Sequence, residues 1–183
     1  MKGSAQQHPV AAHPPSAVGD LEAVAEARSR PGGVSLRARA LQFLARRDHS
    51  RAELRSKLLQ HAADEAALDA LLDDLESVQL LSDRRYAEVV ARSRGARYGV
   101  ASVARTLSRN GVAPEVAAEA LAPLRVSERQ RALEVCRRRF KAPAADLRER
   151  ARQHRFLLAR GFNPATVSWV LKHCDRDFSG ADD

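Results

Sequence analysis

The chain of 183 residues has few aromatic side chains, two cysteines and no long apolar segment. Aromatic residues make up only 4%, so a core must be built from Leu, Val and Ala, which favours slim helices. Cys136 and Cys174 have no paired spacing, which argues against a disulfide framework and fits a reducing compartment. Without an apolar run near 20 residues or a secretory signal, we expect a cytoplasmic protein that makes no membrane contact.

Positive charge, in contrast, is in excess and is unevenly distributed. The formal net charge is +8; residues 84–160 hold 19 basic and 7 acidic side chains, a net +12, whereas residues 35–83 hold 7 and 9, a net −2. A positive field of this kind favours nucleic acid or an acidic protein surface as the partner. The alternative is that arginine only keeps an Ala-rich protein in solution.

One helix junction occurs twice in the sequence, at an offset of 50 residues. LSRNGVAPEVAAEAL, at 107–121, aligns without a gap on LLARGFNPATVSWVL, at 157–171. Each copy has a glycine suited to a left-handed C-terminal position and a proline suited to a first helical turn. These residues are Gly111 and Pro114 in the first copy, and Gly161 and Pro164 in the second. We therefore predict positive φ at both glycines.

Capping residues and apolar periodicity divide the rest of the chain into nine helices. The expected N-terminal signals are Ser35, Ser50, Asp64, Ser82, a capping box at Ser127–Gln130, Asp146 and Asn163, with a break at Gly99. The sequence thus predicts an all-α fold of three tandem three-helix repeats in an elongated, curved array whose stacked units bury one another's faces. The expected boundaries are 35–81, 82–125 and 126–174, between a disordered N-terminal tail at 1–34, where a short helix near 20–30 is possible, and a C-terminal tail at 175–183.

Neither catalytic nor cofactor-binding patterns are present. GARYG, at 95–99, lacks the strand and the spacing of a phosphate-binding loop. The acidic run of Asp73, Asp74 and Glu76 spreads around a helix, as on a solvated face, and Cys136, His154, His173 and Cys174 lack zinc-site spacing. Both cysteines, and Trp169, are interpreted as packing residues. We expect no enzyme activity, no metal and no cofactor.

A helix-turn-helix in residues 103–121 is a rival interpretation, but its second helix offers Glu115 and Glu119 and no cation for base edges. The arginines lie on other helices, at spacings that place them on single faces. Such ridges can follow a phosphate backbone or an acidic groove without reading sequence. They are Arg105 with Arg109; Arg148, Arg152 and Arg155; and Arg137 with Lys141.

Three separated blocks, in order, resemble the RecX family, bacterial regulators of the RecA recombinase. The central block, LLSDRRYAEVVARSRGARYGVASVARTLSRNGV at 80–112, resembles the family's central signature; ALQFLARRDHSRAELRSKL at 40–58 resembles its first unit, and 157–171 its last. The matching positions of the central block are Leu81, Asp83, Tyr86, Ala87, Arg94, Gly99, Val103, Leu107, Gly111 and Val112. Thr106 departs from the pattern, since an acidic residue is common there, and the N-terminal tail lies outside the family core.

The resemblance implies a non-enzymatic protein that binds the RecA–single-stranded DNA filament. It would lie along the filament groove as a monomer, span neighbouring subunits, and curb filament growth, ATP hydrolysis and strand exchange in recombination, DNA repair and the SOS response. Direct contact with single-stranded DNA would be weak and salt-sensitive. Candidate contact residues are Arg92, Arg94, Arg97 and the ridge residues named above. The alternative function is general, sequence-independent nucleic-acid binding through the arginine ridges.

Overall fold

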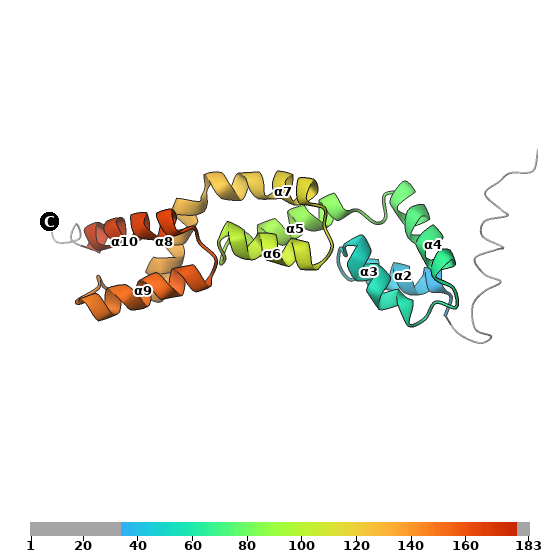
Figure 1. Ribbon diagram of the computed structural model, residues 1–183, viewed down its shortest axis with the longest axis horizontal. Coiled ribbons are helices and arrows are strands. Elements are labelled where there is room, and N and C mark those ends of the chain that lie inside the picture. The colour runs from blue at the N-terminus through green and yellow to red at the C-terminus, as the bar shows by residue number, and fades with distance from the viewer. Residues whose placement is uncertain (1–33, 179–183) are drawn as a thin grey trace, which may run out of the picture.

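The computed structural model describes residues 34–178, and this part of the chain contains nine α-helices and no strand. The expected tails and the possible helix near residues 20–30 lie mostly or wholly outside the described residues. The helices form three successive sets of three along an elongated row (Figure 1). They are α2 (Leu36–Leu44), α3 (Arg51–Leu59), α4 (Glu65–Ser77), α5 (Asp83–Gly95), α6 (Val100–Arg109), α7 (Pro114–Val126), α8 (Glu128–Arg139), α9 (Leu147–Ala159) and α10 (Pro164–Phe178).

Each set of three helices has its own hydrophobic core. Leu54, Leu68 and Leu75 are fully buried in the first repeat (α2–α4), and Val103 and Leu107 in the second (α5–α7). The third core, in α8–α10, is likewise built only from residues of its own repeat. The expectation that stacked units bury one another's faces was therefore wrong: the repeats join end to end, so apolar burial stays within each unit.

Local capping starts most of the helices as predicted. The side chains of Ser35, Ser50, Asp64, Ser82 and Asp146 each accept a hydrogen bond from a backbone N–H in the first turn. The capping box at Ser127–Gln130 was wrong, because Ser127 makes no capping bond. Its hydroxyl instead donates to the Pro123 carbonyl at 2.9 Å, and α7 runs almost directly into α8.

The two repeated junctions have the predicted geometry. Gly111 and Gly161 have φ of 72° and 78°, and Pro114 and Pro164 are the first residues of α7 and α10. After each glycine the next backbone N–H returns to a carbonyl in the last turn of the helix, at 3.1 Å and 3.3 Å. Glycine takes this left-handed conformation without the strain that a Cβ would cause.

The repeats are joined by polar contacts that occur twice in the same places. At the first joint the Asp83 carboxylate, at the start of α5, accepts from the Arg51 N–H at 2.7 Å. At the second joint the Glu128 carboxylate, at the start of α8, accepts from the Val100 N–H at 3.0 Å. Arg51 and Val100 each begin the middle helix of the preceding repeat, so each carboxylate satisfies a helix N-terminus of the neighbouring unit.

The glycine turns press against the same helix N-termini. At the first joint the Ser50 hydroxyl donates to the Asn110 carbonyl at 2.6 Å, directly before Gly111. At the second joint the Gly99 N–H donates to the Arg160 carbonyl at 2.9 Å, directly before Gly161. The junction is thus repeated because it is the surface by which each unit docks on the one before it.

This docking also explains why the first repeat departs from the pattern. His61 stands 50 residues before Gly111, in the turn between α3 and α4, and it is exposed. No repeat precedes α2 in the described part of the chain, so no helix end presses on this turn. A close backbone approach is not required there, and the glycine and proline are dispensable.

Candidate nucleic-acid interface

Four of the six arginines of the first repeat are neutralised by its own carboxylates, whereas Arg39 and Arg46 form no ion pair with another described residue. Arg51 pairs with Asp73 and Glu76, both at 2.6 Å, and Arg55 bonds Asp69 at 2.7 Å. Arg37 with Asp74, and Arg47 with Glu53, are also ion pairs. The acidic run at 73–76 therefore binds arginine, and no group that could hold a metal ion occurs among the described residues.

Most candidate cations of the second and third repeats are different: they are exposed and form no ion pair with another residue of the described part. Arg109 donates only to the carbonyl of Arg105, at 3.5 Å. Their charge is therefore available to a partner. They are Arg92, Arg97, Arg105, Arg109, Lys141, Arg148, Arg152 and Arg155.

Two of the candidates lie in other surroundings. The Arg94 guanidinium lies 4.7 Å from the centre of the Tyr98 ring, and its buried Nε has no hydrogen-bond partner. Arg94 therefore packs within its own repeat. Arg137 is half-buried and already has an interaction within the protein, so it is not a free cation, and the predicted pair with Lys141 is not a ridge of two exposed charges.

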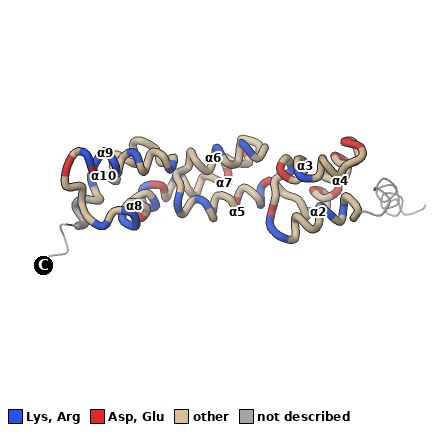
Figure 2. The backbone as a smooth tube through the Cα atoms, turned by 90° about the horizontal axis from the view of Figure 1, so that it is seen from below, with Lys and Arg blue, Asp and Glu red and all other residues tan. Residues whose placement is uncertain are grey.

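The two remaining ridges belong to helices that follow one another along one edge of the array (Figures 1 and 2). The middle helices α3, α6 and α9 follow one another along this edge, and basic residues are visible on α6 and α9 (Figures 1 and 2). Arg105 and Arg109 are one turn apart on α6, where with Ala104 and Ser108 they line a shallow hollow. Arg148, Arg152 and Arg155 share a face of α9, spanning about 10 Å at 1.5 Å per residue. We call this surface the α6–α9 edge, defined by these five arginines.

The helix following the first glycine turn is unsuited to reading bases. In α7, Glu115 and Glu119 are exposed, and Glu119 lies 3.5 Å from the guanidinium of Arg84. Its buried and partly buried side chains, among them Leu121, belong to the core of the second repeat. Carboxylates on the outer face of this helix would repel phosphates, so the α6–α7 pair is structural rather than a base-reading unit.

One partly buried arginine was missed by the sequence reasoning. Arg131 of α8 donates to the backbone carbonyls of Gly95, of Tyr98 at 3.0 Å and of Leu124 at 2.7 Å, all in the second repeat. Burial lowers its pKa from the usual arginine value, but the carbonyls satisfy its donors. At the first joint, Arg85 bonds the carbonyls of Gln79 and Leu80 in the same way.

Glu128 was also missed, because it was assigned to the false capping box. It is buried, and its second carboxylate oxygen accepts from the Thr166 hydroxyl at 3.2 Å. Nothing in the local sequence distinguishes it or Arg131 from exposed charged residues, since all their partners in other repeats or helices, apart from Leu124, lie 28–38 residues away. Trp169, expected in the core, is partly buried and stacks on His173 with ring centres 4.0 Å apart.

The residues of the family-like central block have identifiable structural places. Tyr86, Ala87 and Leu107 are buried in the second core, and the Tyr86 hydroxyl accepts from the Asn110 side chain at 2.8 Å. Asp83 and Gly99 lie at the joints described above. These residues build the array, whereas the arginines of the α6–α9 edge are exposed and take no part in a core. None of the described helices is long and apolar enough to cross a membrane.

Comparison with known proteins assigns all three repeats to one family. The family model of the RecX first three-helix domain matches residues 37–75, that of the second matches 82–121, and that of the third matches 127–171. These matches follow one another in the order of the three helical repeats and together span well over half of the chain.

Relatives and solved structures agree with that assignment. Proteins named regulatory protein RecX are similar to this chain. The one from Leptothrix cholodnii is 46% identical over 82% of this chain and 96% of the relative. The one from Ralstonia nicotianae is 46% identical over 78% of this chain and 89% of the relative. The crystal structure of RecX from Lactobacillus salivarius has a TM-score of 0.63 at 21% identity over 76% of this chain and 94% of that one, which shows the fold. A second crystal structure, of regulatory protein RecX, has a TM-score of 0.66 at 18% identity over 85% and 75%. With three family domains in order and regulatory relatives along most of its length, the chain belongs to the RecX family.

Proposed function

We propose that this protein binds the RecA–single-stranded DNA filament and inhibits RecA ATP hydrolysis, filament growth and strand exchange, with the α6–α9 edge as its contact surface. The observation that carries the proposal is the division of charge: four of the six arginines of the first repeat pair with its own carboxylates, whereas the five arginines of the edge are exposed without acidic partners among the described residues. A filament of acidic protein and DNA supplies the complementary charge.

The elongated shape supports the same proposal. A filament presents the same surface at regular intervals, and an end-to-end array can contact several subunits at once (Figure 1). Weak contacts made by successive repeats then add through effective concentration, so no single repeat needs high affinity. Because the joints hold α6 and α9 along one edge, the protein needs little reordering on binding. In this proposal it acts as a monomer in the cytoplasm and has no catalytic role.

The test is DNA-dependent ATP hydrolysis by RecA, measured against increasing concentrations of this protein. The variant Arg105→Ala/Arg109→Ala removes two charges from the edge, and Arg138→Ala/Arg139→Ala removes two from α8, which is outside that edge. We expect the α6 double variant to need at least about tenfold more protein for half inhibition, and the α8 variant to resemble the parent. Equal potency of both double variants would contradict the assignment of the edge.

General binding of nucleic acid is a second candidate, favoured by the same unpaired arginines. In that case inhibition would appear only at concentrations that coat the DNA, and RecA would not be needed for binding. Fluorescence anisotropy of labelled single-stranded DNA, with and without RecA, separates the two functions. Under our proposal the protein binds the filament at concentrations at which it leaves bare DNA free.

A further inference from the structure

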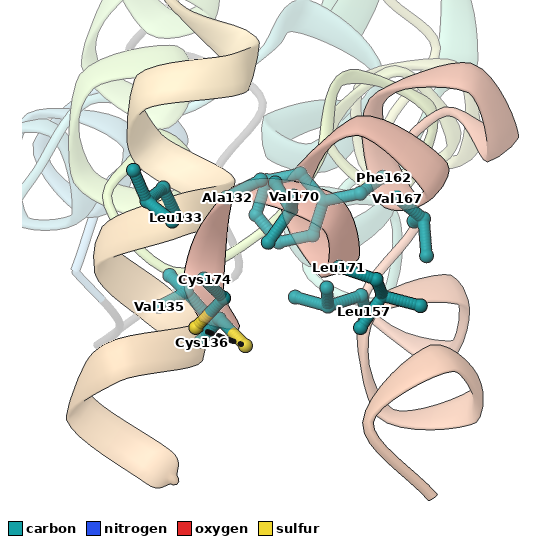
Figure 3. Close-up of a cluster of buried hydrophobic side chains, with 10 residues drawn as sticks. All are labelled: Ala132, Leu133, Val135, Cys136, Leu157, Phe162, Val167, Val170, Leu171 and Cys174. Atoms are coloured by element: carbon teal, nitrogen blue, oxygen red, sulfur yellow. Dashed lines mark hydrogen bonds between the residues drawn. The ribbon is translucent and has the colours of Figure 1, made fainter. Parts of the chain in front are cut away.

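The two cysteines are buried side by side in the core of the third repeat. Cys136 belongs to α8 and Cys174 to α10; their residues are 0% and 2% exposed, and their sulfur atoms are 3.6 Å apart. Figure 3 shows the two sulfurs meeting across the contact between the helices. They are separated by 38 positions in the chain, so the sequence argument against a disulfide framework, which used spacing alone, did not detect this pair.

We propose that Cys136 and Cys174 are a redox modification site: they form a reversible intramolecular disulfide when the protein is exposed to a peroxide. Disulfide sulfurs are about 2.05 Å apart, so the two atoms must approach by about 1.5 Å. Rotation about the side-chain bonds and a small shift of α10 toward α8 supply this movement. This inference is independent of RecA binding.

The position of the pair gives a small oxidant a route to it. Cys174 lies one turn before the end of α10 at Phe178, and Cys136 lies three residues before the end of α8 at Arg139. Helix ends open at a lower free-energy cost than the centre of a core, so local fraying can expose these sulfurs without unfolding the repeat. The surrounding side chains, such as Leu157 and Leu171, are apolar and offer no competing nucleophile.

The chemistry balances with hydrogen peroxide as the oxidant. The thiolate of Cys174, the slightly more exposed of the two, attacks one peroxide oxygen; the O–O bond breaks, and the leaving hydroxide takes a proton to become water. The sulfenic acid formed is then attacked by the Cys136 sulfur, an S–S bond forms, the S–O bond breaks, and the thiol proton leaves with the hydroxide as a second water. Two thiols and one peroxide give one disulfide and two waters. Because the chain has only these two cysteines, each is the single intramolecular thiol available to the other.

The disulfide would restrain the repeat that carries α9. The closed loop runs from α8 to α10 and contains all of α9, including Arg148, Arg152 and Arg155. Cross-linking a loop of this size limits the unfolded chain more than the folded one. Oxidation is therefore expected to raise the thermal unfolding midpoint of the full-length protein, on the order of 5 °C.

The test uses the full-length protein treated with hydrogen peroxide, quenched, denatured and alkylated with iodoacetamide. Mass spectrometry should show a monomer whose two cysteines accept no alkyl group and are linked to each other, and dithiothreitol should restore both thiols. In glutathione redox buffers, the effective concentration of the two thiols should be at least about tenfold higher in the native protein than in urea, because a disulfide that fits the fold is stabilised by it.

Three outcomes would overturn the proposal: both cysteines still alkylated after peroxide, sulfinic acid or cross-linked dimers as the main products, or an effective concentration no higher in the native protein than in urea. The control variant is Cys174→Ala, in which peroxide should produce no internal cross-link and no rise in the unfolding midpoint. If that variant fails to fold, the glutathione measurement on the parent protein still decides the question.

Discussion

Gly99 is the position at which the smallest substitution should open a joint between repeats. Its φ is −72°, so alanine can adopt the backbone conformation without strain. A Cβ built there, however, would lie closer than 3.0 Å to the carbonyl oxygen and carbon of Gly161 and to the Phe162 nitrogen, all backbone atoms of the next repeat. Gly99→Ala is therefore a steric wedge with no conformational penalty of its own.

The expected magnitude follows from the contacts that the wedge breaks. Moving the turn away stretches the bond from the Gly99 N–H to the Arg160 carbonyl and strains the bond from the Val100 N–H to Glu128. Losing two hydrogen bonds costs about 1 kcal/mol each, and overpacking costs about 1–3 kcal/mol more. These losses outweigh the gain of about 0.4–1 kcal/mol that alanine brings by making the unfolded chain less flexible. We expect a loss of about 3 kcal/mol in the free energy of unfolding.

Gly95→Ala is the matched control. Gly95 is also buried and does not have positive φ, but a Cβ there would meet the tip of the Leu124 side chain, at 2.5 Å from Cδ2, within the same repeat. A leucine can rotate away at a cost of about 0.5–1.5 kcal/mol, close to the gain from replacing glycine at a helix end. This variant should therefore stay within about 1 kcal/mol of the parent.

The assay is urea unfolding followed by circular dichroism, combined with hydrogen exchange. Gly99→Ala should also speed exchange of the amide at position 99 and around Phe162, while the first joint, at Val112, exchanges as in the parent. If Gly99→Ala and Gly95→Ala agree within about 0.5 kcal/mol, the close backbone approach does not hold the repeats together and the reasoning is refuted.

Three further predictions concern single residues. Gln79 has φ of 59° and is exposed, so Gln79→Gly should raise the unfolding free energy by about 0.5–1 kcal/mol in urea unfolding, and a loss would contradict the assigned turn. Glu128→Ala should cost about 2–3 kcal/mol by the same measurement, because it leaves the partly buried N–H of Val100 and the buried Thr166 hydroxyl without their acceptor. Glu134→Ala, on the exposed face of α8, should cost less than about 0.5 kcal/mol. Burial lowers the pKa of His49 despite the nearby Glu53 carboxylate, so the unfolded chain binds a proton at this histidine more readily than the folded chain does. The stability that the neutral, buried imidazole contributes is therefore present above about pH 6.5 and is lost as the pH falls below that value. The stability advantage of the parent over His49→Asn should accordingly shrink between pH 7.5 and pH 5, and an unchanged difference would refute it.

The helices and their turns follow from local sequence. A cap such as Ser50 bonds an N–H three residues away, so its partner is within the same short segment. The left-handed turn at Gly111 likewise needs only the preceding helix and a residue without a Cβ. Apolar periodicity then assigns the core face of each helix, which is why the all-α repeats were predictable without the structure.

Only the tertiary structure decided how the repeats meet and which charges remain free. From the sequence, Glu128 and Arg131 are expected to be surface residues of a basic helix. In the structure both form hydrogen bonds with residues 28–38 positions away in other helices. Arg51 and Arg105 look alike in the sequence, but carboxylates of α4 neutralise the first and none reaches the second. Cys136 and Cys174 approach to 3.6 Å only because α8 packs on α10. Local chemistry fixes contacts within a turn of helix, whereas contacts between segments depend on the path of the chain between them, which no short pattern encodes.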